Sequence, residues 1–253
     1  MAVGVLDKKI IGVIPARYNS IRLPGKPLKD IFGKPMIYWV AKKVKASILE
    51  EFYVATDDKR ILEACNEYAI PCLMTSSECS NGTERVAEVA NKVFANYYVN
   101  IQGDEPCIEV EAINKLVRSV SNFSNINFLQ AVSKLKDKKA ILNPSVVKVA
   151  ISEKNEALYY SRLPIPFSRD NLNLNNGIHY RCLGLYLYSR KFLNKYLLMP
   201  PAHLENIESI EQLRILENRI TINTVEVIDD AVSIDTLDDL EKIRNSKQEY
   251  FLE

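Results

Sequence analysis

The sequence predicts an α/β fold in which a mostly parallel sheet, with some antiparallel strands, is flanked by helices. Two observations predict it. Through the first half of the chain, short apolar runs alternate with segments in which apolar residues recur every three or four positions, as in strands joined by helices. From about residue 127, strand-like runs follow one another with less helix between them, which predicts antiparallel strands or a smaller subdomain.

The first half predicts four strands, each followed by a helix. Consecutive strands joined by helices run parallel, so their carboxyl ends meet at one edge of the sheet. Ligands of such sheets bind at this edge. The predicted strands are 10–15, 51–57, 72–76 and 97–104, and the helices that follow them are 35–47, 59–69, 83–93 and 109–120.

The second half predicts further strands and two helices. Asn81 is expected to cap the third helix of the first half, and Asp235 or Thr236 the last helix of the chain. The segment 170–177, DNLNLNNG, is rich in turn-forming residues and is predicted to be a mobile loop. The strands of this half are predicted at 128–135, 146–152, 157–162 and 183–189, and the helices at 204–218 and 236–246.

Composition excludes several functions. The 253 residues, 47% hydrophobic, suffice for one large domain or two small ones. The 33 basic and 32 acidic residues nearly cancel, so no overall field attracts nucleic acid or an anionic membrane. No apolar run approaches the roughly 20 residues of a membrane-spanning helix, and MAVGVLDKK is too short and polar for a secretory signal, so we expect a cytoplasmic protein.

The cysteines and histidines also limit the chemistry. The five cysteines are odd in number and include no CxxC pair, which argues against a disulfide framework or a zinc site. The two histidines leave little room for a histidine triad or a multi-histidine metal site. Carboxylates and cations must therefore supply any catalysis.

Cations follow the first predicted strand. The stretch ARYNSIRLPGKP carries Arg17, Arg22 and Lys26 and no acidic residue. Such a loop could surround a polyphosphate with cationic side chains and free backbone N–H groups. It could equally be a solvated surface loop, and the residues of this stretch leave both readings open.

Carboxylates follow two other apolar runs. Asp104 lies in NIQGDEP, where it could hold a hard divalent cation beside phosphates, although Gly, Asp and Pro also favour a simple turn. Asp235 lies in SIDTLDDLE, where it could serve as a ligand or belong to a helix cap. The segment 81–85 opens a helix and could present backbone N–H groups to a ligand.

A series of motifs, in order over nearly the whole chain, resembles the 3-deoxy-manno-octulosonate (Kdo) cytidylyltransferases, or CMP-Kdo synthetases. Each motif is weak, but the ordered set is specific. The motifs are IPARYNSIRLPGKPL, GKPMI, VATDD, SNGTERVAEV, VNIQGDEP, NPSVVKV, ALYYSR, IEQLR and SIDTLDDLE.

The resemblance implies one domain, residues 1–253, with a Rossmann-like nucleotide-diphospho-sugar transferase fold. About 1–125 would form the nucleotide-binding half and about 126–253 the sugar-binding and dimerisation half. The implied enzyme is usually a homodimer that joins Kdo to CTP, with Mg²⁺ as cofactor, and releases pyrophosphate. Its product, CMP-Kdo, would feed lipopolysaccharide biosynthesis.

The resemblance also implies roles for individual residues. Asp104 and Asp235 would hold Mg²⁺, and Arg17 and Lys26 would complete the catalytic group. The implied CTP contacts are Arg17, Arg22, Lys26, Ser80, Gly82, Arg85 and Gln102, and the implied sugar contacts are Arg162, Glu211 and Gln212.

One position departs from the family's pattern. Members commonly carry His where this chain has Cys182, and a thiol cannot donate the charge-assisted hydrogen bond of a histidinium. We expect Arg181 or His179 to take over this sugar contact. Glu84 and Glu105 favour Kdo over its 8-amino analogue, because the related branch tends to have Asp and Gln there. CMP transfer to 8-amino-Kdo or another acidic sugar, and a catalytically silent nucleotide-binding protein, are the alternatives.

Overall fold

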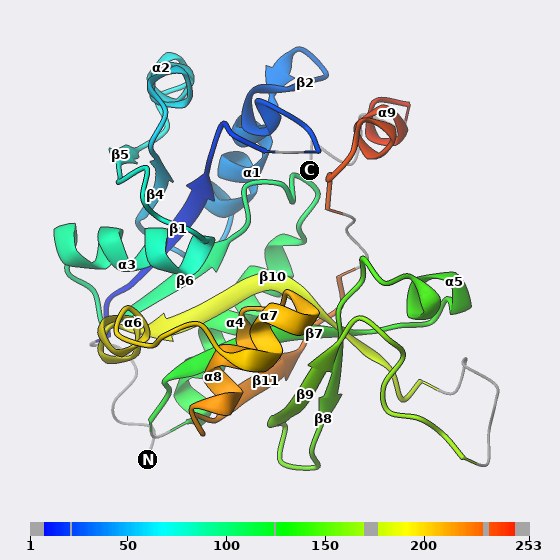
Figure 1. Cartoon of the computed structure of the whole chain (residues 1–253). Coiled ribbons are helices and arrows are strands. Elements are labelled where there is room, and N and C mark those ends of the chain that lie inside the picture. Colours follow the sequence, from blue (N-terminus) through cyan, green and yellow to red (C-terminus); the bar gives the residue numbers. More distant parts are fainter. Residues whose placement is uncertain (1–7, 21, 124, 170–176, 230–232, 246–253) are drawn as a thin grey trace.

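A computed structural model gives the arrangement of the chain (Figure 1). Residues 170–176 of the loop predicted from the sequence lie outside the residues that it describes. Within the described part, no helix has the length and apolar character that crossing a membrane requires. The described residues are 8–20, 22–123, 125–169, 177–229 and 233–245.

Nine strands of the described residues form one mixed sheet. These strands are β1 (Ile10–Ala16), β4 (Phe52–Thr56), β5 (Cys72–Met74), β6 (Tyr97–Ile101), β7 (Phe128–Lys134), β8 (Lys148–Ile151), β9 (Ala157–Ser161), β10 (Tyr180–Ser189) and β11 (Ile222–Glu226). Their order is β11-β7-β10-β6-β1-β4-β5, and β8 and β9 continue from β10. The strands β6, β1, β4 and β5 pair in parallel, as do β11 and β7, whereas β10 is antiparallel to both of its neighbours in this order. The predicted mostly parallel mixed sheet is therefore confirmed.

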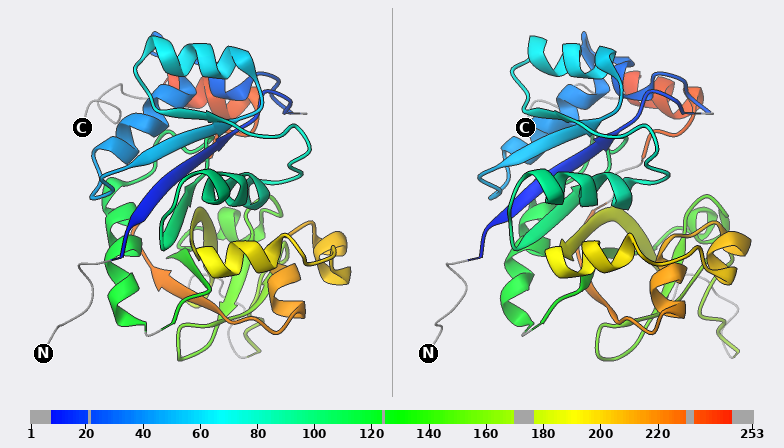
Figure 2. Two further views of the ribbon diagram at one scale, coloured as in Figure 1. Left: turned by 90° about the vertical axis from the view of Figure 1, so that its left-hand side faces the viewer. Right: turned by 60° about the vertical axis from the view of Figure 1, so that its left-hand side comes forward.

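Helices cover both faces of the sheet (Figures 1 and 2). They are α1 (Met36–Lys45), α2 (Lys59–Glu67), α3 (Gly82–Lys92), α4 (Val110–Arg118), α5 (Lys138–Leu142), α6 (Arg190–Tyr196), α7 (His203–Glu208), α8 (Gln212–Glu217) and α9 (Leu237–Arg244). Because side chains alternate between the faces of a strand, Ile14 of β1 belongs to the core that includes residues of α1, α2 and α4, and Val13 belongs to the core that includes residues of α3, α6 and α8. The alternation in sequence thus produces two hydrophobic cores.

Helix caps follow the predicted residues. The Asn81 side chain accepts a hydrogen bond from the Glu84 backbone N–H at 2.9 Å and caps α3. Thr236, rather than Asp235, caps α9 by accepting from the Asp239 backbone N–H at 3.2 Å. The Asp235 carboxylate is therefore left for contacts outside the helix.

The second half departs from the prediction in two places. The helix predicted over 204–218 is broken into α7 and α8, because Ser209 adopts a left-handed conformation with φ 53°. Strand β11 was not predicted, although its β-branched residues Ile222, Thr224 and Val225 favour extended backbone. The antiparallel part predicted from the sequence consists of β8 and β9, which join the main sheet through β10.

A small hairpin lies beside the C-terminal helix (Figures 1 and 2). Its strands are β2 (Asp30–Ile31) and β3 (Lys34–Pro35), and it follows the short 3-10 helix η1 (Lys26–Leu28). A second 3-10 helix, η2 (Ser119–Asn122), follows α4. Helix α9 packs against β2 although about 200 residues separate them in the sequence, which brings this helix next to the segment that follows β1.

Candidate functional site

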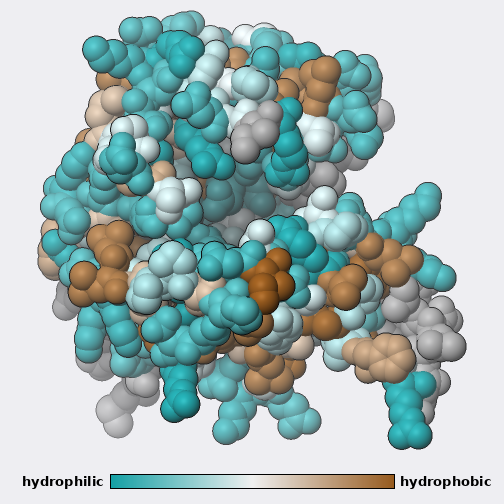
Figure 3. Space-filling model, viewed as in Figure 1, coloured by the Kyte–Doolittle hydropathy of each residue, from teal (hydrophilic) through white to brown (hydrophobic). Residues whose placement is uncertain are grey.

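A cavity of about 490 Å³ lies at the carboxyl ends of β1 and β6. Figure 3 shows the surface hollowed here, with mostly hydrophilic side chains around the opening. The cavity brings together residues from the loop after β1, the start of α3, the turn after β6 and two distant positions. The sequence-predicted residues that line it are Arg17, Arg22, Lys26, Ser80, Gly82, Arg85, Gln102, Asp104, Glu211 and Asp235.

The loop after β1 is held in shape by a glycine and an aromatic ring. Gly25 has φ +68°, and a Cβ atom there would lie 3.1 Å from the ring of Tyr18. A side chain at position 25 would therefore be both strained and crowded. The guanidinium of Arg60 stacks on the Tyr18 ring, with its central carbon 3.3 Å from the ring centre. These contacts fix the loop that presents Lys26 to the cavity.

Lys26 joins two carboxylates that are distant in sequence. Its Nζ lies 2.7 Å from Asp104 Oδ2 and 3.0 Å from Asp235 Oδ1, and its side chain is 12% exposed. Burial disfavours the ammonium ion, but the charges and hydrogen bonds of Asp104 and Asp235 outweigh burial and raise the pKa of Lys26. The lysine is therefore a permanent cation at physiological pH.

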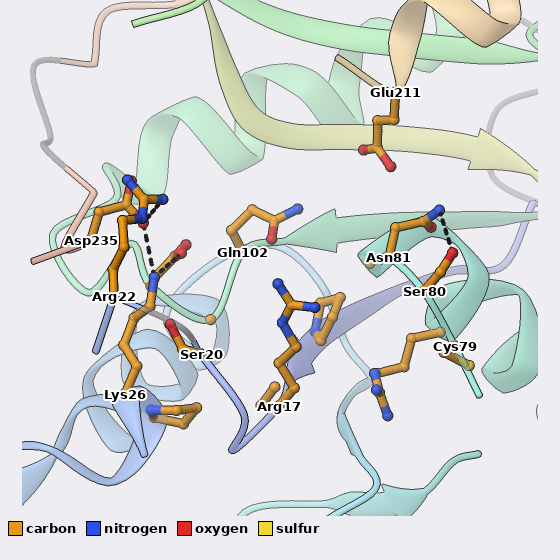
Figure 4. Close-up of a pocket in the computed structure, with 17 residues that line it drawn as sticks. Arg17, Ser20, Arg22, Lys26, Cys79, Ser80, Asn81, Gln102, Glu211 and Asp235 are labelled. Atoms are coloured by element: carbon orange, nitrogen blue, oxygen red, sulfur yellow. Dashed lines mark hydrogen bonds and ion pairs between the residues drawn. The ribbon is translucent and has the colours of Figure 1, made fainter. Parts of the chain in front are cut away.

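The two arginines of the loop differ in their contacts. Arg22 Nη2 lies 3.0 Å from Asp235 Oδ1, so this carboxylate forms ion pairs with Arg22 and Lys26 together. Among the described residues, no carboxylate pairs with Arg17. Figure 4 shows the Arg17 side chain pointing between the Lys26 end of the cavity and Gln102. Arg17 is thus placed to bind an anion that enters the cavity.

The carboxylates of Asp104 and Asp235 fit a divalent cation. Their oxygens converge on one ammonium nitrogen, and carboxylate oxygens are the ligands that Mg²⁺ prefers. Among the described residues, no group of three or more His, Cys, Asp and Glu side chains is arranged around a metal position. A pair of carboxylates is nevertheless a usual protein contribution to a Mg²⁺ site, with phosphate oxygens and water as the other ligands.

The turn that carries Asp104 rests against a glycine of β10. The Gln102 backbone N–H donates to Gly184 O, and the Gly184 N–H donates to Glu105 Oε1, both at 3.2 Å. A Cβ atom at position 184 would lie 2.4 Å from Gln102 Cγ, so only glycine fits. Burial, and then the charges of Asp104 and Asp229, raise the pKa of Glu105 to about 8.

The start of α3 forms the other end of the cavity. The Ser80 backbone N–H and hydroxyl both donate to the Glu84 carboxylate, at 2.7 Å. Arg85 lines the cavity but is almost fully buried, and its Nη1 donates to Thr75 Oγ1 at 2.5 Å. Its Nη2 lies 3.5 Å from Asp57 Oδ2. The CTP contacts implied for Ser80, Gly82 and Arg85 stay predictions.

Glu211 faces this end of the cavity from the α7–α8 turn (Figure 4). Thr83 Oγ1 donates to Glu211 Oε2 at 3.3 Å. Burial raises the pKa of Glu211 to about 7, partly opposed by the Thr83 hydrogen bond. Its carboxyl therefore exists in both the neutral and the charged form near neutral pH. Gln212, the next residue, is buried and is not among the described residues that line the cavity.

Arg162 contacts the same turn from outside the cavity. Its Nε, Nη1 and Nη2 donate to the carbonyl oxygens of Glu208, Pro144 and Ser209 at 2.7, 3.0 and 3.1 Å. The guanidinium thereby anchors the turn that leads to Glu211. The implied contact of Arg162 with a sugar stays a prediction.

The residues expected to compensate for Cys182 have other contacts. Arg181 Nη2 donates to Asp229 O at 2.5 Å. His179 is 2% exposed, and its Nδ1 lies 2.9 Å from Ile165 O. Burial raises the pKa of the Cys182 thiol to about 12. Neither Arg181 nor His179 is among the described residues that line the cavity, so their compensating role also stays a prediction.

Three lining residues whose side chains carry a hydroxyl, thiol or amide group were not individually assigned to the site from the sequence: Ser20, Cys79 and Asn81. Asn81 was expected to cap a helix, and it does so while it also faces the cavity. The Cys79 thiol donates to Glu88 Oε1 at 3.3 Å. Ser20 lies within the cationic stretch 16–27, and Cys79 directly precedes Ser80. This closeness to predicted site residues is the only feature of the sequence that could have indicated their place in the cavity.

The layout of the cavity suits an elongated anion. Arg22, Lys26 and the two carboxylates lie at one end, the start of α3 lies at the other with Arg85 and Glu211, and Arg17 lies between them (Figure 4). Cations of this kind neutralise a polyphosphate, and the backbone at a helix start can contact the rest of the ligand. The site is therefore arranged for chemistry at a phosphate.

Comparison with known proteins agrees with this layout. Residues 11–222 match the family model of the cytidylyltransferases. The chain is 42% identical over 238 residues to the 3-deoxy-manno-octulosonate cytidylyltransferase of Fusobacterium nucleatum, covering 94% of this chain and 96% of that protein. It is 44% identical over 237 residues to the enzyme of the same name from Polynucleobacter necessarius, covering 92% and 93%. A solved structure of CMP:2-keto-3-deoxy-manno-octonic acid synthetase complexed with CTP has a TM-score of 0.86 and 38% identity, covering 93% of this chain and 97% of that one.

Proposed function

Because the chain belongs to the family of the 3-deoxy-manno-octulosonate cytidylyltransferases, we propose that it transfers CMP from CTP to Kdo. The products are CMP-Kdo, a precursor for lipopolysaccharide biosynthesis, and pyrophosphate. The observation that carries the proposal is the convergence of Asp104 and Asp235 on Lys26, in one cavity with Arg17 and Arg22.

The reaction is an in-line transfer at the α-phosphorus of CTP. The 2-hydroxyl oxygen of Kdo attacks this phosphorus, the bond to the bridging oxygen breaks, pyrophosphate leaves, and the hydroxyl proton passes to solvent. A triphosphate carries roughly four negative charges near neutral pH, which repel the attacking oxygen unless cations neutralise them. Arg17, Arg22 and Lys26 supply such cations and stabilise the leaving pyrophosphate.

Asp104 and Asp235 are the residues that would hold Mg²⁺. When bound, the ion supplies positive charge at the phosphates and lowers the pKa of a coordinated hydroxyl. The chain itself contributes positioning: Lys26 holds the two carboxylates together, and Gly184 fixes the turn that carries Asp104. No protein nucleophile is needed, because positioning and charge neutralisation account for the chemistry.

The sugar would lie on the Glu211 side of the cavity, with Gln102 close to the nucleotide. Glu211 is a hydrogen-bond acceptor when charged, and its neutral form can also donate. Either form can bond to a sugar hydroxyl. Arg162 supports this arrangement indirectly, since it anchors the α7–α8 turn.

Pyrophosphate release tests the proposal and separates it from the alternatives. Purified protein is supplied with CTP, Mg²⁺ and Kdo, 8-amino-Kdo or a sialic acid in parallel. We expect release with Kdo and much less with the other acceptors. Release with another acceptor only would keep the reaction and change the substrate. If CTP binds but no acceptor supports release, the protein is a silent nucleotide-binding homologue and the proposal is wrong.

We also propose that the chain forms a homodimer through residues 126–253. This half carries a group of large apolar side chains that are exposed in the single chain, and Figure 3 shows hydrophobic residues over its surface. Exposed apolar surface of this kind is typical of interfaces. Apart from Leu237 on α9, the side chains are Leu142, Leu158, Leu163, Phe167, Leu197, Leu198, Ile207 and Ile228.

Sedimentation equilibrium tests the dimer. We expect a mass of twice the 28.8 kDa of one chain, and we expect Phe167→Glu to shift the protein towards monomer because a charge would be buried in the interface. Phe94→Glu is the matched control, since Phe94 is also largely exposed but lies in the first half. A monomeric wild type, or equal effects of both substitutions, would exclude this interface.

A further inference from the structure

A small apolar cluster lies apart from the two main cores and includes residues next to the loop and the carboxylate at the Lys26 end of the cavity. We call it the α9 cluster. It joins the loop after β1, the β2–β3 hairpin, α1 and the C-terminal segment, which are far apart in sequence. Its members are Leu23, Ile31, Met36, Trp39, Ile234 and Leu240, none of them more than 5% exposed.

The cluster determines where Asp235 lies. Ile234, directly before it, is fully buried in the cluster, and its backbone N–H donates to Asp104 O at 2.9 Å. Thr236, directly after it, caps α9, and Leu240 buries this helix against the cluster. The Asp235 carboxylate is thus held between a buried residue and the start of a docked helix. Its distance from Asp104 depends on that docking.

Hydrogen bonds also join α9 to the β2–β3 hairpin and the hairpin to α1. Arg244 donates from Nε and Nη2 to Asp30 O, at 2.9 and 2.8 Å. Trp39 donates from Nε1 to Ile31 O at 2.7 Å and ties the hairpin to α1. Figures 1 and 2 show α9 beside β2 in each view. Each end of the helix is therefore fixed, one at Asp104 and one at the hairpin.

We propose that the α9 cluster is a positioning element that couples the cationic loop to Asp235, and that Leu240 is its central positioning residue. Leu23 lies in the same loop as Lys26 and Arg22, the two cations that contact Asp235. When α9 docks, Asp235 is therefore placed both opposite Asp104 and in contact with Arg22 and Lys26. The inference rests on the proposed function, because that function requires Asp104 and Asp235 to bind Mg²⁺ together.

Close packing gives this coupling its strength. Removing a buried leucine side chain leaves a cavity that the surroundings only partly fill, so Leu240→Ala should favour states in which α9 is undocked. In those states Asp235 is not available beside Asp104, and the apparent affinity for Mg²⁺ falls in proportion to the docked fraction. The Glu211 end of the cavity does not depend on α9 and should keep its properties.

Titration with Mg²⁺ in the presence of CTP tests the proposal. Trp39 is the only tryptophan of the chain and belongs to the cluster, so its emission should change as the site fills. We expect Leu240→Ala to raise the midpoint of the Mg²⁺ titration by about tenfold, with little change in the KM for Kdo. Leu237→Ala is the matched control, because Leu237 lies on the same helix and is 53% exposed. It should behave as the wild type does.

Arg244→Ala provides a milder variant in case Leu240→Ala does not fold. It removes only the contacts to Asp30 O and should raise the midpoint by a smaller factor. The midpoint from Trp39 emission does not require turnover, so the coupling can be tested even if the acceptor sugar is wrong. If Leu240→Ala and Arg244→Ala both fold and titrate like Leu237→Ala, α9 does not position the cation site and the proposal is wrong.

Discussion

Asp104→Asn is expected to lower the rate of pyrophosphate release at least about 100-fold, because a loss of about 3 kcal/mol of transition-state stabilisation has this effect and metal-ion charge stabilisation is worth several kcal/mol. Asp235→Asn should have an effect of the same size, because the Asp235 carboxylate contacts the same Lys26 ammonium nitrogen as Asp104 does and belongs to the same proposed Mg²⁺ site. An amide keeps the shape of the side chain and removes the charge. The rate is measured over a range of Mg²⁺ concentrations.

The control for these two variants is Asp238→Asn. Asp238 is exposed on α9, three residues from Asp235, and lies outside the cavity lining, so its substitution should leave the rate unchanged. Circular dichroism and thermal unfolding show whether each variant keeps the fold. A near-normal rate with unchanged Mg²⁺ dependence in either active-site variant would remove that residue from the proposed metal site.

Lys26→Met is expected to lower kcat/KM for CTP by about 100-fold, a typical effect of losing one preorganised charge-stabilising group. The ammonium ion is largely buried between Asp104 and Asp235. Without it, the two carboxylates repel each other and the triphosphate loses a cation. Because the pKa of Lys26 is raised from 10.5, the lysine stays charged from pH 6 to 9. Any change in the wild-type rate over that range must come from other groups.

Lys29→Met is the matched control for the lysine. Lys29 follows η1 directly but does not line the cavity, so its substitution should change kcat/KM by less than about threefold, as expected away from a site. Saturation kinetics with CTP separate the effects on KM and kcat. If Lys26→Met and Lys29→Met gave similar values, Lys26 would have no part in binding or stabilising the phosphates.

Part of the candidate site followed from the sequence by topology. Arg17, Lys26 and Asp104 follow predicted strands that proved to be parallel neighbours, β1 and β6. Parallel strands place their carboxyl ends side by side, so the cavity between these residues could be predicted from the order of elements. The pairing of Asp104 with Asp235 came only from the family resemblance, because no local pattern relates residues this far apart.

The sugar side of the site was less predictable. The sequence favours one helix over 204–218, and the break at Ser209 is what lets Glu211 face the cavity. Arg162 was assigned to the sugar, but it donates to two backbone carbonyls at that break, Glu208 O and Ser209 O, and to Pro144 O. The contacts of a guanidinium depend on residues that folding brings together. The residues next to Arg162 in the sequence therefore do not predict them.

The four sheet strands of the first half, the helices that follow them, the Asn81 cap and the charged loops at the strand ends could be predicted from the sequence alone. Each depends on residues within a few positions of one another, through side-chain period, propensity or capping. The antiparallel position of β10 between β6 and β7 and the placement of Asp235 beside Asp104 by α9 could not be predicted from local sequence patterns. These arrangements depend on which apolar faces bury one another, and contacts between distant segments set that outcome.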